Sequence, residues 1–82
     1  MVNAGVEVAL SFIEVWQNTL TLLAHNPGVG SLRFEEDLHI SGLRAWTMRG
    51  FPHLVLYVVD AEGPEVQRVL HSARDLPFAL RD

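Results

Sequence analysis

A histidine and two arginines lie close together near the end of the chain, in the segment RVLHSARD: Arg68, His71 and Arg74. Histidine exchanges protons near neutral pH and arginine binds phosphate oxygens, so together they could transfer a proton beside a bound phosphate group. Their spacing argues against joint action, because Arg68 and His71 lie three positions apart and strand side chains alternate between faces. The alternative interpretation is that the three residues pair with Asp75, Asp60 or backbone carbonyls. They are the candidate catalytic set only if the chain is a nuclease.

Other reactive groups predict neither a metal site nor a cofactor. The acidic run Glu35–Asp37 lacks the spacing of an EF-hand and is typical of a solvated loop. His25, His39 and His53 lack zinc-ligand spacing, and the sequence has no cysteine, no glycine-rich phosphate loop and no paired nucleophile and base. Tyr57 lies within an apolar run, which favours a core residue with a hydrogen-bonded hydroxyl over an acid.

The charge of the chain and the length of its apolar runs argue against nucleic-acid binding and against a membrane span. The 82 residues include no lysine, and residues 1–41, with one arginine against five acids, hold the whole net charge of −4. Proteins that coat RNA or wrap duplex DNA normally carry a basic excess, so direct nucleic-acid binding is not expected. No apolar run is long enough for a membrane span, and the first residues do not resemble a signal peptide. We expect one cytoplasmic domain over residues 1–82, without membrane contact.

A long amphipathic helix is predicted over Ala4–His25, where Asn26 and Pro27 supply a stop. Its apolar residues form two adjacent stripes. The first stripe has 3-4 spacing and comprises Val6, Ala9, Ile13, Trp16, Leu20 and Leu23, and the second comprises Val8, Phe12, Val15 and Leu22. So wide an apolar arc exceeds what one small sheet can cover. Part of the helix is therefore expected to bind something else.

Three short strands follow, over Leu43–Met48, His53–Val59 and Glu65–His71. Short turns with glycine and proline join them, so an antiparallel meander with the middle strand at its centre is expected. A helical turn near Leu76–Leu80 follows the last strand. The predicted fold class is α+β, with the long N-terminal helix packed on a three-stranded antiparallel sheet.

Four segments resemble the RelE/ParE superfamily of bacterial toxins, whose members are also described as plasmid-stabilisation proteins. They are LAHNPGVG at the helix end, GLR at Gly42–Arg44, FPHLVLYVVD at Phe51–Asp60 and RVLHSARD at Arg68–Asp75. The last is similar to the closing strand of the ParE-like branch. Members usually begin with a further strand and helix, so the resemblance implies an N-terminally shortened member or an internal start at Met1.

The resemblance implies the toxin of a type II toxin–antitoxin system. A ParE-like toxin is expected to inhibit DNA gyrase by protein binding, without catalysis, and to be neutralised by a cognate antitoxin. A RelE-like member would instead be a ribosome-dependent, metal-independent mRNA endoribonuclease, and an inactive remnant could serve as an interaction domain. The acidic charge, the RVLHSARD segment and a C-terminus without tyrosine or histidine favour the ParE-like interpretation.

The predicted partner-binding residues are Phe12, Val15, Leu22 and Trp16 on the helix. Exposing Phe12, Val15 and Leu22 would forgo roughly 1.5–3 kcal/mol for each large side chain. A sheet without the first strand of its family would also present an open edge. The isolated chain is therefore expected to form a homodimer, helix against helix, and an antitoxin segment to occupy the same surface in the cell.

Overall fold

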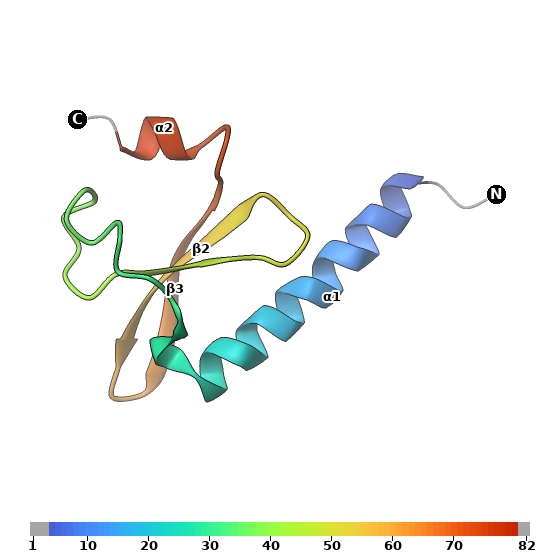
Figure 1. Cartoon of the computed structure of the whole chain (residues 1–82). Coiled ribbons are helices and arrows are strands. Elements are labelled where there is room, and N and C mark those ends of the chain that lie inside the picture. Colours follow the sequence, from blue (N-terminus) through green and yellow to red (C-terminus); the bar gives the residue numbers. More distant parts are fainter. Residues whose placement is uncertain (1–3, 81–82) are drawn as a thin grey trace.

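The structure, a computed structural model, describes residues 4–80 and has one long helix beside a small sheet (Figure 1). In chain order its elements are α1 (Ala4–His25), the 3₁₀ turn η1 (Pro27–Val29), β1 (Arg44–Thr47), β2 (His53–Asp60), β3 (Gly63–His71) and α2 (Leu76–Ala79). The predicted α+β fold class is confirmed. The bounds of α1 agree with the prediction, and the strand ends differ from it by one or two residues.

The sheet is an antiparallel meander in the order β1-β2-β3, so β2 is central. Leu54 pairs with Thr47 on one side and with Leu70 on the other. The β2–β3 turn is closed by the Glu62 N–H, which donates to the Asp60 carboxylate at 2.8 Å, and by Gly63 at φ 119°. Among residues 4–80, β3 pairs with β2 alone, so its other edge is open.

Two apolar clusters cover the two faces of β2. The cluster on the side of α1 consists of buried Leu23, Met48, Val55 and Tyr57, with half-buried Phe12, Val15, Trp16, Trp46 and Phe51 around it. The cluster on the opposite side consists of Phe34, Leu43, Ala45, Leu54, Leu56 and Leu70, covered by residues of the preceding loop and of α2. Burial on both faces explains why the sequence of β2 is nearly unbroken in its hydrophobicity.

Tyr57 and Arg44 fasten the end of α1 to the sheet. The Tyr57 side chain is fully buried, its hydroxyl donates to the Pro27 carbonyl at 2.7 Å, and the Gly30 N–H donates to that hydroxyl at 2.9 Å. The Arg44 guanidinium donates to the carbonyls of Gly28 and Gly30 at 3.2 and 2.8 Å. The predicted core position and hydrogen-bonded hydroxyl of Tyr57 are therefore confirmed.

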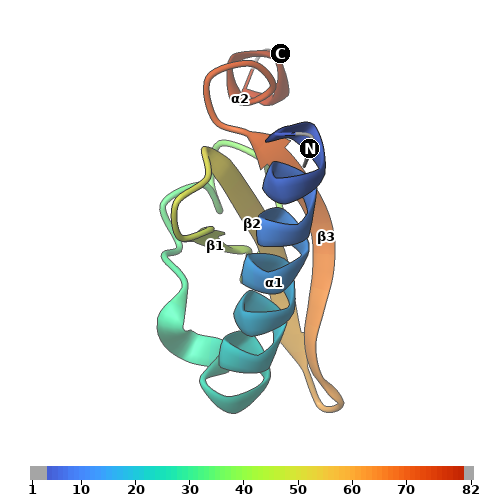
Figure 2. The same cartoon turned by 90° about the vertical axis from the view of Figure 1, so that its right-hand side faces the viewer.

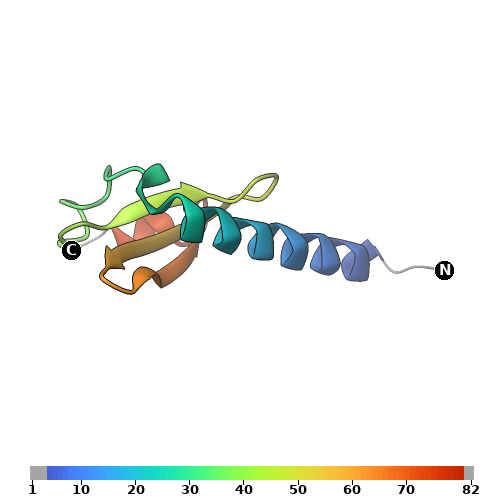
Figure 3. The same ribbon diagram turned by 90° about the horizontal axis from the view of Figure 1, so that it is seen from below.

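Only part of α1 packs on the sheet. Figure 2 shows α1 crossing in front of the sheet close to β3, and Figure 3 shows its N-terminal half extending beyond the other elements. The radius of gyration is 13.9 Å, against about 12 Å for a compact domain of this length. No helix within the described residues has the length and apolar character needed to cross a membrane.

The two apolar stripes face differently from the prediction. Phe12, Val15 and Trp16 pack on the α1-side cluster and Leu22 is half-buried, so the expectation that the Phe12 stripe needs a partner to leave water is wrong. Of that stripe only Val8 stays exposed, together with Val6, Leu10, Ile13 and Leu20 from the rest of the helix. An apolar arc this wide could meet the sheet in more than one rotation, and in the structure the side with Phe12, Trp16 and Leu23 packs on it.

Candidate functional site

The turn after β3 joins His71, Arg74 and Asp75 through backbone hydrogen bonds. The His71 N–H donates to the Asp75 carboxylate at 2.9 Å, and the Arg74 N–H donates to His71 Nδ1 at 3.1 Å. Because Nδ1 accepts a hydrogen bond, a neutral His71 ring carries its proton on Nε2. The His71 imidazole and the Asp75 carboxylate therefore each accept a hydrogen bond from the backbone of their own turn.

The groups that lower the pKa of Asp75 belong to the same turn. The His71 N–H is the largest cause of a pKa of Asp75 below its ordinary value of 3.8, and the nearby Arg74 lowers it as well. The Arg74 Nε lies 3.5 Å from the carboxylate, but its side chain is three-quarters exposed, so the pair is a weak surface interaction. The interpretation of these residues as an ion-paired turn fits this geometry.

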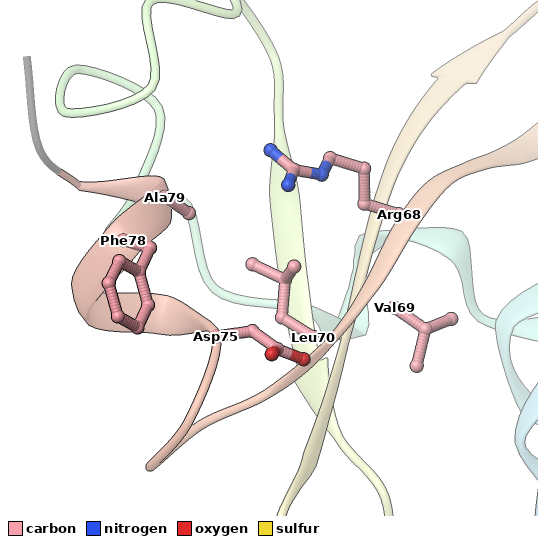
Figure 4. Close-up of a pocket in the computed structure, with 6 residues that line it drawn as sticks. All are labelled: Arg68, Val69, Leu70, Asp75, Phe78 and Ala79. Carbon is pink, nitrogen blue, oxygen red and sulfur yellow. The ribbon is translucent and has the colours of Figure 1, made fainter.

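Arg68 lies on the opposite face of the sheet from His71. It pairs with Leu56, which belongs to the cluster away from α1, whereas His71 pairs with His53, whose ring contacts Phe12 on the α1 side. Figure 4 shows Arg68 and Leu70 on one side of β3 and Val69 on the other. The predicted separation of Arg68 from His71 is confirmed, so the three candidate nuclease residues do not converge.

A shallow pocket lies below α2. Its lining consists of Arg68, Val69, Leu70, Asp75, Phe78 and Ala79 (Figure 4). Within residues 4–80, the side chain of Arg68 forms no ion pair or hydrogen bond, so it could bind an anion or a partner carboxylate. The Asp75 carboxylate in the lining is already engaged by the His71 N–H and lies beside Arg74, so Arg68 is the group of this pocket that is left for a ligand.

The predicted partner-binding residues line two hollows, one on each side of α1. Phe12 and Trp16 form one hollow with Val69 of β3. Val15 and Leu22 border the other, whose lining also includes Asn18, Thr19, Trp46 and Arg49. Both hollows are shaped by contacts with the sheet, and a role of these four residues in partner binding stays a prediction.

Sequence reasoning missed one line on α1, which we name the outer seam. It joins Val6, Ile13 and Leu20 of the first predicted stripe to Leu10, with the polar Gln17 in the same spacing. Its side chains are exposed, and Leu10 is the most exposed of the four apolar ones at 62%. Leu10 belongs to neither predicted stripe, although the 4-3-4-3 spacing of the seam was visible in the sequence. The described residues hold no group of histidine and acidic side chains able to bind a metal ion.

Comparison with known proteins agrees with this architecture. The family model described as the ParE toxin of the type II toxin–antitoxin system parDE matches residues 1–76. No curated protein and no solved structure gives a significant match. Since the model covers nearly the whole chain, the protein belongs to the ParE toxin family of type II toxin–antitoxin systems, as the resemblance implied.

Proposed function

We propose that this ParE toxin acts by binding a target protein in the cytoplasm, with DNA gyrase as the candidate target, and that it does not cut RNA. The observation that carries the proposal is the placement of Arg68 and His71 on opposite faces of the sheet. The hydrogen bonds that engage His71 Nδ1 and the Asp75 carboxylate within their own turn support it further. The acidic net charge of −4 is also unfavourable for a protein that must approach RNA.

The family implies a cognate antitoxin as the neutralising partner. We propose that this antitoxin binds along α1, which exposes more large apolar side chains than any other element of the described residues, and that isolated chains associate in pairs in its absence. The exposed residues of α1 and the open edge of β3 both support such contacts.

A direct test compares two activities of the purified chain. We expect inhibition of DNA supercoiling by gyrase, reversed by the antitoxin encoded beside this gene, and no cleavage of mRNA with or without ribosomes. Arg68→Ala and His71→Ala should keep gyrase inhibition within about twofold, a change of less than 0.5 kcal/mol. Circular dichroism would establish that both variants fold.

Two results would contradict the proposal. Ribosome-dependent mRNA cleavage that disappears in Arg68→Ala or His71→Ala would establish a RelE-like nuclease. Absence of gyrase inhibition, of mRNA cleavage and of growth arrest on expression would indicate an inactive remnant that acts only as an interaction domain.

A further inference from the structure

The outer seam has the repeat of a helix that packs against another helix. Its residues are spaced by four, three, four and three positions, which is the repeat of a two-helix interface, and four of the five are apolar while Gln17 is polar. The exposed fractions of Val6, Leu10, Ile13 and Leu20 are 52%, 62%, 50% and 38%. These four side chains lie along one line of the helix. No other element within residues 4–80 covers that line.

This seam is distinct from the surface that α1 uses against its own sheet. The sheet side is formed by Thr19 and Leu23, both buried, with Phe12 and Trp16 beside them. The seam lies on another side of the same helix and runs for about 21 Å, at 1.5 Å per residue. It is long enough to receive about four turns of a second helix.

Charge along the seam indicates what kind of helix it would receive. Glu7 and Glu14 each follow a seam residue, Val6 and Ile13, and therefore border the seam on the same side. Residues 4–32 contain no lysine or arginine. Residues that border an apolar seam select partners by charge, so a partner with cations beside its own apolar line is favoured.

A second copy of this chain meets that requirement poorly. It would place its own outer seam there and offer no cation to Glu7 or Glu14 in either orientation. In the antiparallel orientation, Leu10 of one copy lies opposite Ile13 of the other, and Glu7 then comes near Glu14 of the second copy. Like charges at that position weaken the pair.

We propose that the outer seam binds an amphipathic helix of another protein whose apolar line is flanked by lysine or arginine. The inference rests on the proposed function, because it specifies the chemistry of the segment that occupies α1. Pairing of isolated chains through the seam is then the weaker alternative, and added salt should strengthen it, whereas salt should weaken the heterologous complex.

Two designed peptides test the proposal on the full chain. Both are amphipathic helices with leucine in a four-three repeat, and they differ only in having lysine or glutamate beside that repeat. Fluorescence anisotropy should show the lysine peptide binding about tenfold or more tighter than the glutamate peptide at low salt. The difference should shrink as the salt concentration rises from about 0.05 to 0.5 M.

Substitutions in the protein then locate the binding surface. Leu10→Glu and Ile13→Glu should weaken the lysine peptide about tenfold or more, since each buries a charge in the contact. The double substitution Glu7→Lys, Glu14→Lys should reverse the preference between the peptides. Val8→Glu is the matched control, because Val8 is 59% exposed on the same helix but lies off the seam.

Several outcomes would overturn the inference: binding of neither peptide, equal binding of both, or equal loss in Val8→Glu and Leu10→Glu. Sedimentation showing self-pairing tighter than peptide binding at low salt would assign the seam to a second copy. If the antitoxin still neutralises Leu10→Glu while peptide binding fails, the seam inference is wrong and the proposed function stands. If gyrase inhibition fails while the lysine peptide binds, the proposed function is wrong and the seam inference stands.

Discussion

The two halves of α1 have similar apolar content but different environments. The C-terminal half buries Thr19 and Leu23 against the sheet and ends at a turn held by Tyr57 and Arg44. The N-terminal half extends beyond the sheet and exposes Val6 and Leu10 (Figure 3). The C-terminal half therefore stabilises the fold, whereas the N-terminal half, apart from Phe12, carries large apolar residues that the sheet does not cover.

The buried polar groups of the C-terminal half of α1 and of the turn after it form specific hydrogen bonds. Thr19 is buried, but its hydroxyl donates to the Val15 carbonyl at 2.7 Å and so avoids the cost of an unsatisfied donor. The Gly30 N–H, also buried, is satisfied by the Tyr57 hydroxyl. The attached half of α1 thus depends on specific contacts, which makes it sensitive to substitution. The extending half should tolerate change unless a partner covers it.

The largest contrast is expected between two leucines of α1. Leu23→Ala should lower the free energy of unfolding by about 2–5 kcal/mol, because Leu23 is 1% exposed and its truncation leaves a cavity. Leu10→Ala should change it by less than about 0.5 kcal/mol, as for most surface substitutions. Urea denaturation of both variants measures the difference. Similar losses in the two variants would mean that the N-terminal half also contributes to folding, for example within a dimer.

A second contrast concerns two glycines, Gly28 within η1 and Gly30 directly after it. A Cβ added at Gly30 would lie 2.6 Å from the Tyr57 hydroxyl oxygen, whereas one added at Gly28 would meet no atom within 4 Å. Gly30→Ala must therefore displace the tyrosine or the turn, and it should cost about 1–3 kcal/mol. Gly28→Ala is the matched control and should stay within about 0.5 kcal/mol of the wild type.

Thermal unfolding followed by circular dichroism would compare the two glycine variants. Tyrosine fluorescence or near-ultraviolet dichroism would report whether Tyr57 has moved. A stable Gly30→Ala variant with an unchanged Tyr57 signal would mean that this turn is not what holds α1 on the sheet.

Local features of the fold could be predicted from the sequence, and the rotation of α1 could not. The Asn26–Pro27 stop and the apolar periodicity defined Ala4–His25, because such signals act within a few residues. Which side of α1 meets the sheet depends on packing against residues far along the chain, such as Met48 and Val55. An apolar arc that is wide in sequence does not specify one inward direction, so the exposed line through Leu10 was missed.

At the candidate site, the sequence predicted which side chains lie apart but did not predict the hydrogen bonds within the turn. Strand alternation alone predicted that Arg68 and His71 do not converge, since this property depends only on their separation along one strand. The hydrogen bond from Arg74 to His71 Nδ1 needed the structure, because it arises from the conformation of the turn after β3.

The smallest predicted effect concerns the carboxylate that closes this turn. The pKa of Asp75 is lowered in the folded chain, chiefly by the His71 N–H, so its ionised form favours folding. That contribution is complete above the ordinary pKa of 3.8 and is lost as the pH falls through the lowered folded value.

Asp75→Asn keeps an oxygen that can accept from the His71 N–H but cannot titrate. We therefore expect the wild type to be slightly more stable than Asp75→Asn at pH 7, and the two stabilities to converge below pH 3.8. Urea denaturation of both proteins across this pH range measures the difference, in which the other carboxylates cancel. A constant difference at every pH would mean that the charge of Asp75 contributes nothing to the fold and that only its hydrogen bond matters.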